Sequence, residues 1–194
     1  MASIAENVQD ARSRGRRNDN RASVGGWIFA AVLLITSIGL FLVLDAAQRA
    51  EARIAEWAIA TVLNTGTRVT GDGMSVLVGI GGTRAFTLQI GIACSVVLIL
   101  VPFLLIAAAM LASGRASVWR AIPAVIIGAL ALLAINAARL VLIAHLTMQD
   151  GLDGFGWAHT VYGSAVVLIG LVLVIVAFIV VMAIGRRRGR SASS

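Results

Sequence analysis

The sequence predicts an all-α integral membrane protein: a four-helix transmembrane bundle with a small extracytoplasmic hairpin before the second span. Hydrophobic residues make up 59% of the 194 residues and charged residues only 13%, whereas about a quarter of a soluble domain is charged. The apolar residues also gather into separate runs close to or above the ~18 residues that a helix needs to cross a bilayer. We therefore expect one membrane domain over residues 25–185, with spans at about 27–44, 90–112, 121–145 and 157–184.

The first apolar run follows a polar, basic segment over residues 1–24. That segment has too little apolar content to fold alone, so we expect a disordered cytoplasmic tail. A basic stretch before an apolar one is also the pattern of a signal peptide. Residues 27–44 exceed the usual length of a signal-peptide core and lack a small-residue cleavage site, which favours a first span.

Residues 45–65 mix charges with apolar residues at helical spacing, which indicates an amphipathic helix at the membrane interface. A glycine-rich stretch follows. Within it Phe86, Leu88 and Ile90 alternate with smaller or polar residues, and Gly81–Gly82 provide a turn. The alternation predicts a small β-hairpin that leads directly into the second span.

Proline falls within the second and third spans. Pro102 is expected to weaken or kink the second helix, which neighbouring helices accommodate. Pro123 falls in the first turn of the third, where proline is tolerated. An acidic loop over residues 146–156, with three glycines, then leads to the fourth span.

Arginine sets the expected orientation. The N-terminal tail, the 113–120 loop and the C-terminal tail over 186–194 carry five, two and four arginines. The 45–89 segment balances its four arginines with four acidic residues, and the 146–156 loop has acidic residues only. The positive-inside rule therefore places both termini in the cytoplasm. Basic residues that are all arginine indicate a GC-rich bacterial genome, and the bacterial inner membrane is the expected location. Because the net charge of +7 sits in these segments, without interleaved aromatic residues, we expect the bilayer and not nucleic acid as partner.

Three chemically capable residues fall at similar depths in this topology. Cys94 lies about four residues into the second span, Arg139 about six from the end of the third, and His159 about two into the fourth. At 1.5 Å per residue, all three lie within ~3–9 Å of the extracytoplasmic boundary. Their lateral contact does not follow from the sequence.

Each of these residues also has a purely structural interpretation. A lone cysteine in an apolar helix is usually an inert small hydrophobe. Arg139 can extend its guanidinium to the interface, although an arginine within a span costs at least a few kcal/mol. Asn136, one turn before it, makes the pair a polar stripe that points into the bundle. His159 can be an interfacial residue beside Trp157, and His145, at a helix end, fits that role better.

Together the three residues point to thiol chemistry. A histidine can take the proton of a cysteine, whose thiolate then attacks a carbonyl carbon. Arg139 can lower the thiol pKa or stabilise the oxyanion that forms, and Gly163, one turn after His159, lets another backbone approach closely. No acidic residue lies in a span near them, which disfavours a proton-coupled transporter and a carboxylate metal site. A single cysteine also disfavours a disulfide relay, so we expect no metal and no cofactor.

The ordered motifs resemble the exosortase/archaeosortase family of membrane-embedded cysteine transpeptidases. They are Ala93–Cys94–Ser95, Asn136–Ala137–Ala138–Arg139 and His159–Thr160–Val161–Tyr162–Gly163, and the resemblance covers about residues 70–184. It implies that Cys94 is the nucleophile, His159 the acid/base and Arg139 the stabiliser of charge. It also implies a thiol protease that cleaves C-terminal sorting signals (a short motif, a membrane helix and a basic tail) from exported proteins at the extracytoplasmic face.

Two other functions compete with this one. In a non-enzymatic scaffold or assembly subunit, Arg139 and Asn136 would only bond neighbouring helices. A small transporter would need a polar path through the membrane, and the inner halves of the spans carry almost no polar side chains.

Overall fold

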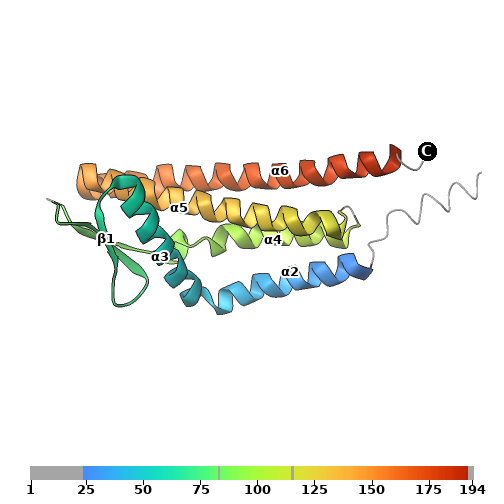
Figure 1. Ribbon diagram of the computed structural model, residues 1–194, viewed down its shortest axis with the longest axis horizontal. Coiled ribbons are helices and arrows are strands. Elements are labelled where there is room, and N and C mark those ends of the chain that lie inside the picture. Colours follow the sequence, from blue (N-terminus) through green and yellow to red (C-terminus); the bar gives the residue numbers. More distant parts are fainter. Residues whose placement is uncertain (1–23, 83, 115, 192–194) are drawn as a thin grey trace, which may run out of the picture.

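The computed structural model describes residues 24–82, 84–114 and 116–191, and side chains are described as far as residue 184. Residues 1–23 of the predicted disordered tail lie outside the described residues, whereas residues 186–191 of the predicted C-terminal tail continue the last helix. The long helices run side by side, and a small β-sheet lies at one end of the elongated molecule (Figure 1). The chain is mostly helical, as predicted, with this sheet added.

Two described stretches are apolar and long enough to cross a membrane. The first is α2 (Val24–Leu42), and the second, Val118–Ile184, contains α5 (Val118–Trp157) and most of α6 (Gly163–Ser191). The remaining apolar helix, α4 (Val97–Ala112), includes Pro102 and has only 16 residues. At ~1.5 Å per residue α4 is shorter than the ~30 Å hydrocarbon core, so helix length does not establish the predicted four-span bundle.

The second predicted span begins later than the expected residue 90. Ile90 still belongs to the sheet edge, because its N–H donates to the Met74 carbonyl at 2.9 Å. Residues Ile92–Cys94 then form the 3₁₀ turn η1, and α4 starts only at Val97. The prediction failed here because one uninterrupted apolar run supplies the end of a strand, a turn and a helix.

The predicted loop over residues 146–156 is also wrong. Helical structure continues through it, with one interruption at Gly151 (φ 68°, ψ −138°), a conformation that glycine adopts far more readily than other residues. A Cβ at Gly154 would lie 2.3 Å from the Leu146 carbonyl oxygen, so the chain returns close against itself. The segment is a tight helical reversal, and the π-helical turn η2 (Ala158–Tyr162) joins it to α6.

The sheet has three antiparallel strands in the order β1-β2-β3, one more than the predicted hairpin. They are β1 (Gly66–Val69), β2 (Ser75–Ile80) and β3 (Phe86–Gln89). Gly81–Gly82 lie in the turn between β2 and β3, as predicted, and Gly81 has a φ of 82°. The sequence missed β1 because its four residues carry no long alternating pattern.

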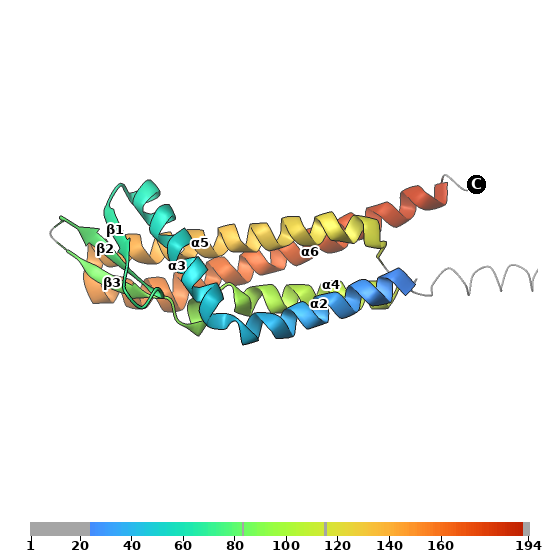
Figure 2. The ribbon, with the colours of Figure 1, turned by 60° about the horizontal axis from the view of Figure 1, so that its bottom comes forward.

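The amphipathic helix is confirmed as α3 (Leu44–Leu63), which crosses obliquely between α2 and the sheet (Figure 2). Its buried side carries small and apolar residues, together with two polar ones: Gln48, Glu51, Ala52, Ala55, Ala58 and Ile59. That side contacts α5 and the sheet, so α3 is anchored to the protein as well as amphipathic.

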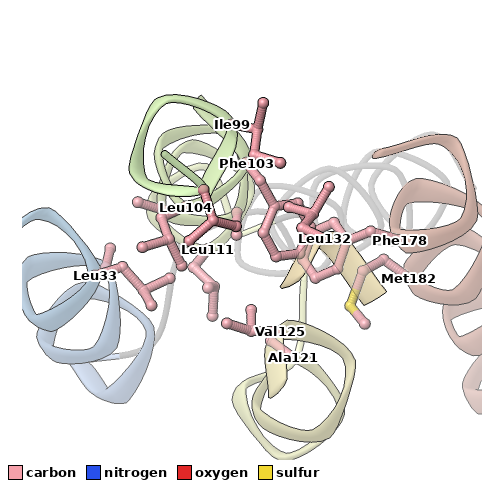
Figure 3. Close-up of a cluster of buried hydrophobic side chains, with 14 residues drawn as sticks. Leu33, Ile99, Phe103, Leu104, Leu111, Ala121, Val125, Leu132, Phe178 and Met182 are labelled. Atoms are coloured by element: carbon pink, nitrogen blue, oxygen red, sulfur yellow. The ribbon is translucent and has the colours of Figure 1, made fainter. Parts of the chain in front are cut away.

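Buried apolar side chains form two clusters. In the helical part, residues from α2, α4, α5 and α6 meet around Phe103, whose ring contacts that of Phe178 edge-on at 5.6 Å (Figure 3). The second cluster joins α3, β2, β3 and α5 and includes Cys94. Cys94 therefore lies at the sheet end of the molecule.

Candidate active site

Cys94 ends the turn that connects the sheet to α4. Its N–H donates to the Gly91 carbonyl at 2.9 Å, and the residue is only 4% exposed. The expectation that Cys94 lies about four residues inside a helix is wrong, because α4 begins three residues after it. The first N–H group of α4, that of Val97, donates to the Ser95 hydroxyl at 3.3 Å, and the thiol takes its position from the turn.

His159 reaches Cys94 from η2. Its Nδ1 lies 3.6 Å from the Cys94 Sγ, close enough for a hydrogen bond to sulfur. Its ring stacks on Phe155, with centroids 5.4 Å apart and planes 10° from parallel. A π-helical turn in an otherwise α-helical segment is frequent at functional sites. The local turn and the stacked ring together direct the imidazole toward the thiol.

Arg139 approaches the same turn from α5. Its Nη1 donates to the Ala93 carbonyl at 3.0 Å, the side chain is 6% exposed, and its buried Nε has no hydrogen-bond partner among the described residues. A Cβ at Gly163 would lie 3.0 Å from that Nε and 2.7 Å from the Ala158 carbonyl oxygen. Gly163 thus makes room for the Arg139 side chain and not for the backbone of another segment, as was expected, because Ala158 belongs to the turn directly before Gly163.

Asn136, one helical turn before Arg139, bonds the adjacent carbonyl. Its Nδ2 donates to the Cys94 carbonyl at 2.9 Å and to Glu51 Oε2 at 3.1 Å. The predicted polar stripe of α5 therefore points inward and binds two consecutive carbonyls of the cysteine turn. Both contacts fix the backbone that carries the thiol.

Glu51 of α3 completes this arrangement, and the sequence analysis missed it. Its Oε1 accepts from the Ser95 hydroxyl at 2.7 Å, and its Oε2 accepts from the Val96 N–H at 2.9 Å. Glu51 is 4% exposed. Burial raises the pKa of Glu51 above its ordinary value of 4.5, and the hydrogen bonds from Ser95 and Val96 partly oppose this rise.

The sequence analysis considered acidic residues only within the spans, so it did not consider Glu51, which lies in α3. A signal was present, because Glu51 shares the apolar side of an amphipathic helix with Ala55 and Ala58. A charged residue at such a position needs buried partners. Those partners lie 44 or more residues away along the chain, so the sequence did not identify them.

At least two cavities lie among the described residues, and neither of these two is lined by Cys94, Arg139 or His159. One, of about 410 Å³, lies between α5 and α6 beside Arg120 and Phe178, and one, of about 380 Å³, lies at the helical reversal beside Leu146 and Tyr162. Among the described residues, no group of three or more histidine, cysteine, aspartate or glutamate side chains is arranged to hold a metal ion. The three candidate residues bring a thiol, an imidazole and a guanidinium to the cysteine turn.

These features define a class: a mostly helical protein with membrane-length apolar helices and, at one end, a buried cysteine beside a half-buried histidine. The family model for transmembrane exosortases (Exosortase_EpsH) matches residues 19–176. The chain belongs to this transmembrane family. No curated protein and no solved structure matched the chain.

Proposed function

We propose that the protein is a cysteine protease/transpeptidase that cleaves C-terminal sorting signals of exported proteins at the extracytoplasmic face of the bacterial inner membrane. The observation that carries this proposal is the 3.6 Å approach of Cys94 Sγ to His159 Nδ1. Family membership supports the same reaction class. The orientation rests on the arginine distribution, with both termini cytoplasmic and the sheet outside.

In the proposed reaction, His159 accepts the Cys94 proton through Nδ1, and the thiolate attacks the carbonyl carbon of the scissile peptide bond. A tetrahedral intermediate forms with a negative charge on the former carbonyl oxygen. Its collapse breaks the C–N bond, His159 returns the proton to the leaving amine, and Cys94 holds the upstream fragment as a thioester. An acceptor nucleophile or water then releases the product and restores the thiol.

Arg139 is proposed to stabilise the developing negative charge. Its guanidinium is anchored by Ala93 through Nη1, and its buried Nε has no hydrogen-bond acceptor within the part of the chain that the structure describes. A fixed cation in a site shielded from water stabilises charge more than it would in water. Asn136 and Glu51 would position the cysteine turn without touching the substrate.

The first prediction concerns the two reacting residues. Cys94→Ala and His159→Ala are expected to abolish processing because one lacks the nucleophile and the other the proton acceptor. The substrates are tagged exported proteins from the source genome that end in a motif, a membrane helix and a basic tail. Processing is measured by the shift of the tagged protein on gels, with equal membrane levels of each variant as the control. Undiminished processing by Cys94→Ala would refute the proposed mechanism.

A scaffold is the second candidate function. The hydrogen bonds from Arg139 and Asn136 to backbone carbonyls favour it, since they tie α5 to the cysteine turn whether or not chemistry occurs. A scaffold predicts that Arg139→Ala lowers the amount of protein in the membrane while Cys94→Ala has no phenotype. The enzyme predicts the loss of processing at normal abundance for Cys94→Ala.

A further inference from the structure

Strand β3 forms one edge of the three-stranded sheet, beside β2 (Figure 2). The pairing of Val76 with Leu88, together with the bond from the Ile90 N–H to Met74, sets the direction of each main-chain group. In an antiparallel pair, alternate residues bond the partner strand and the others point away. The N–H and C=O groups of Thr87 and Gln89 therefore point to the open edge, and both residues are exposed.

The other edge of the sheet is covered. Strand β1 packs against α3, and the Thr67 hydroxyl donates to the Glu56 carbonyl of that helix at 3.1 Å. Unpaired strand edges readily accept another extended chain. Among the described residues, β3 is thus the edge of this sheet that remains open to an added strand.

The open edge leads directly to the cysteine turn. Gly91 keeps an extended backbone (φ −81°, ψ 176°) between β3 and η1, so the strand direction continues to the turn that ends in Cys94. At ~3.3 Å per residue, an extended peptide paired with Gln89 would come level with the thiol within roughly five residues. A substrate paired with β3 upstream of its cleavage site would therefore place that site, a few residues further along, next to Cys94.

We propose that the β3 edge binds the exported substrate as an added parallel strand, through the segment immediately upstream of its cleavage site. This inference rests on the proposed function. In the proposed orientation β3 runs from outside toward the membrane, and a substrate chain that ends in a membrane helix runs the same way. The two strands are therefore parallel. Main-chain bonds from Thr87 and Gln89 hold the substrate with little dependence on its sequence, as in other cases of strand addition.

Proline at position 87 tests the edge selectively. Thr87→Pro removes an N–H that points to the open edge and adds ring atoms there, while the bonds between β2 and β3 remain; proline is tolerated at such edge positions. The loss of main-chain bonds to the substrate predicts a fall of about tenfold or more in the initial processing rate of the tagged sorting-signal proteins. Thr87→Ala keeps the N–H and is expected to lose less than about threefold.

Val69→Pro is the matched control on the covered edge, since the Val69 N–H also points away from β2. It is expected to process substrate at the wild-type rate. Labelling of Cys94 by N-ethylmaleimide at wild-type rate in each variant shows that the turn is intact. A Thr87→Pro protein that processes substrate normally, or an equal loss in Thr87→Ala, overturns the strand-addition proposal while Cys94→Ala still tests the proposed function separately.

A second measurement covers the case in which Thr87→Pro does not accumulate. A photo-crosslinking amino acid at position 87 in a Cys94→Ala protein is expected to capture the tagged substrate just upstream of its motif, and the same group at Arg68 of β1 is not. Equal capture from both positions, or none from position 87, overturns the proposal. If Cys94→Ala still processes substrate, the proposed function has failed and the strand proposal fails with it.

Discussion

Glu51→Ala offers a sharp test of how the cysteine turn is held. The substitution removes the acceptor of three donors: the Ser95 hydroxyl, the Val96 N–H and the Asn136 Nδ2. The Ser95 hydroxyl can rotate to another acceptor, but the Val96 N–H and one N–H of Asn136 are left without a partner. Each buried unpaired donor costs about 1–3 kcal/mol, so we expect the free energy of unfolding to fall by about 2–6 kcal/mol.

Glu51→Gln separates shape from charge at the same position. The amide oxygen of glutamine can accept from Val96 and Asn136 while its NH₂ group donates to the Ser95 hydroxyl oxygen. Because the number of bonds is nearly kept, while both the burial penalty on the charge and its charge assistance are removed, we expect a change of no more than about 1 kcal/mol. The two variants should therefore differ clearly.

The pH dependence gives an independent check. Because burial raises the pKa of Glu51 in the folded protein, the folded state holds this proton more tightly than the unfolded chain does. This contribution to stability is fully present below the ordinary pKa of 4.5 and is lost as the pH rises through the folded value. Glu51→Gln cannot titrate, so its stability should lack this decline.

The assay is unfolding of the detergent-solubilised protein by SDS at several pH values. The labelling rate of Cys94 with N-ethylmaleimide reports on the turn itself and should rise in Glu51→Ala. Glu56→Ala, on the same helix, is the control, because the Glu56 side chain is only half-buried, and we expect a change within about 0.5 kcal/mol. An unfolding free energy for Glu51→Ala equal to that of the control would refute the reasoning.

Two further predictions concern Gly163 and Asp72. Gly163→Ala should destabilise the protein by about 1–3 kcal/mol in the same unfolding assay and reduce processing, because the new Cβ would lie 3.0 Å from Arg139 Nε and 2.7 Å from a backbone oxygen; normal stability and processing would contradict this. The pKa of Asp72 is lowered from 3.8 to about 2 by hydrogen bonds, of which the one from Thr70 has the largest effect, followed by those from Ser75 and the Met74 N–H. The ionised Asp72 therefore stabilises the folded protein above pH 3.8, and this stabilisation is lost as the pH falls through about 2. The free energy of unfolding of Asp72→Asn should lack this acid-dependent decline, and a pH dependence equal to that of the wild type would contradict the prediction.

The helical architecture was predictable where apolarity and periodicity agree. The apolar run before Leu42 and the amphipathic pattern after Leu44 correspond to α2 and α3. The prediction failed where an apolar run contains both strand and helix, because apolar residues are common in both. Ile90 directly follows β3 and still bonds Met74, and Val97 begins a helix, yet both lie in one apolar run, so composition alone could not separate them.

Composition also led to the wrong prediction of a loop around Gly151. Acidic residues and three glycines are typical of a loop, but only Gly151 leaves helical geometry and the rest of the segment packs as helix. Tertiary contact, such as that of Gly154 with the Leu146 carbonyl, overrides the weak local preference.

The sequence predicted that the candidate residues lie at similar depths, but it could not predict which of their side chains touch. Helix depth placed Cys94 and His159 near one boundary, but their 65-residue separation hides the 3.6 Å approach of the two side chains. The sequence analysis did not identify Glu51 because its contacts depend on how α3 packs against the cysteine turn. Periodicity places a residue on one side of a helix and does not say which distant segment covers that side.

The order of the site residues along the chain has a consequence for biogenesis. Glu51, Cys94, Asn136 and Arg139 precede the reversal at Gly151, and His159 follows it. A chain made from its N-terminus can therefore complete the hydrogen bonds around the cysteine turn before the imidazole has been synthesised. In the proposed mechanism the thiol therefore lacks its proton acceptor until the chain has passed the reversal and formed η2, so a nascent chain that ends before His159 should not process substrate.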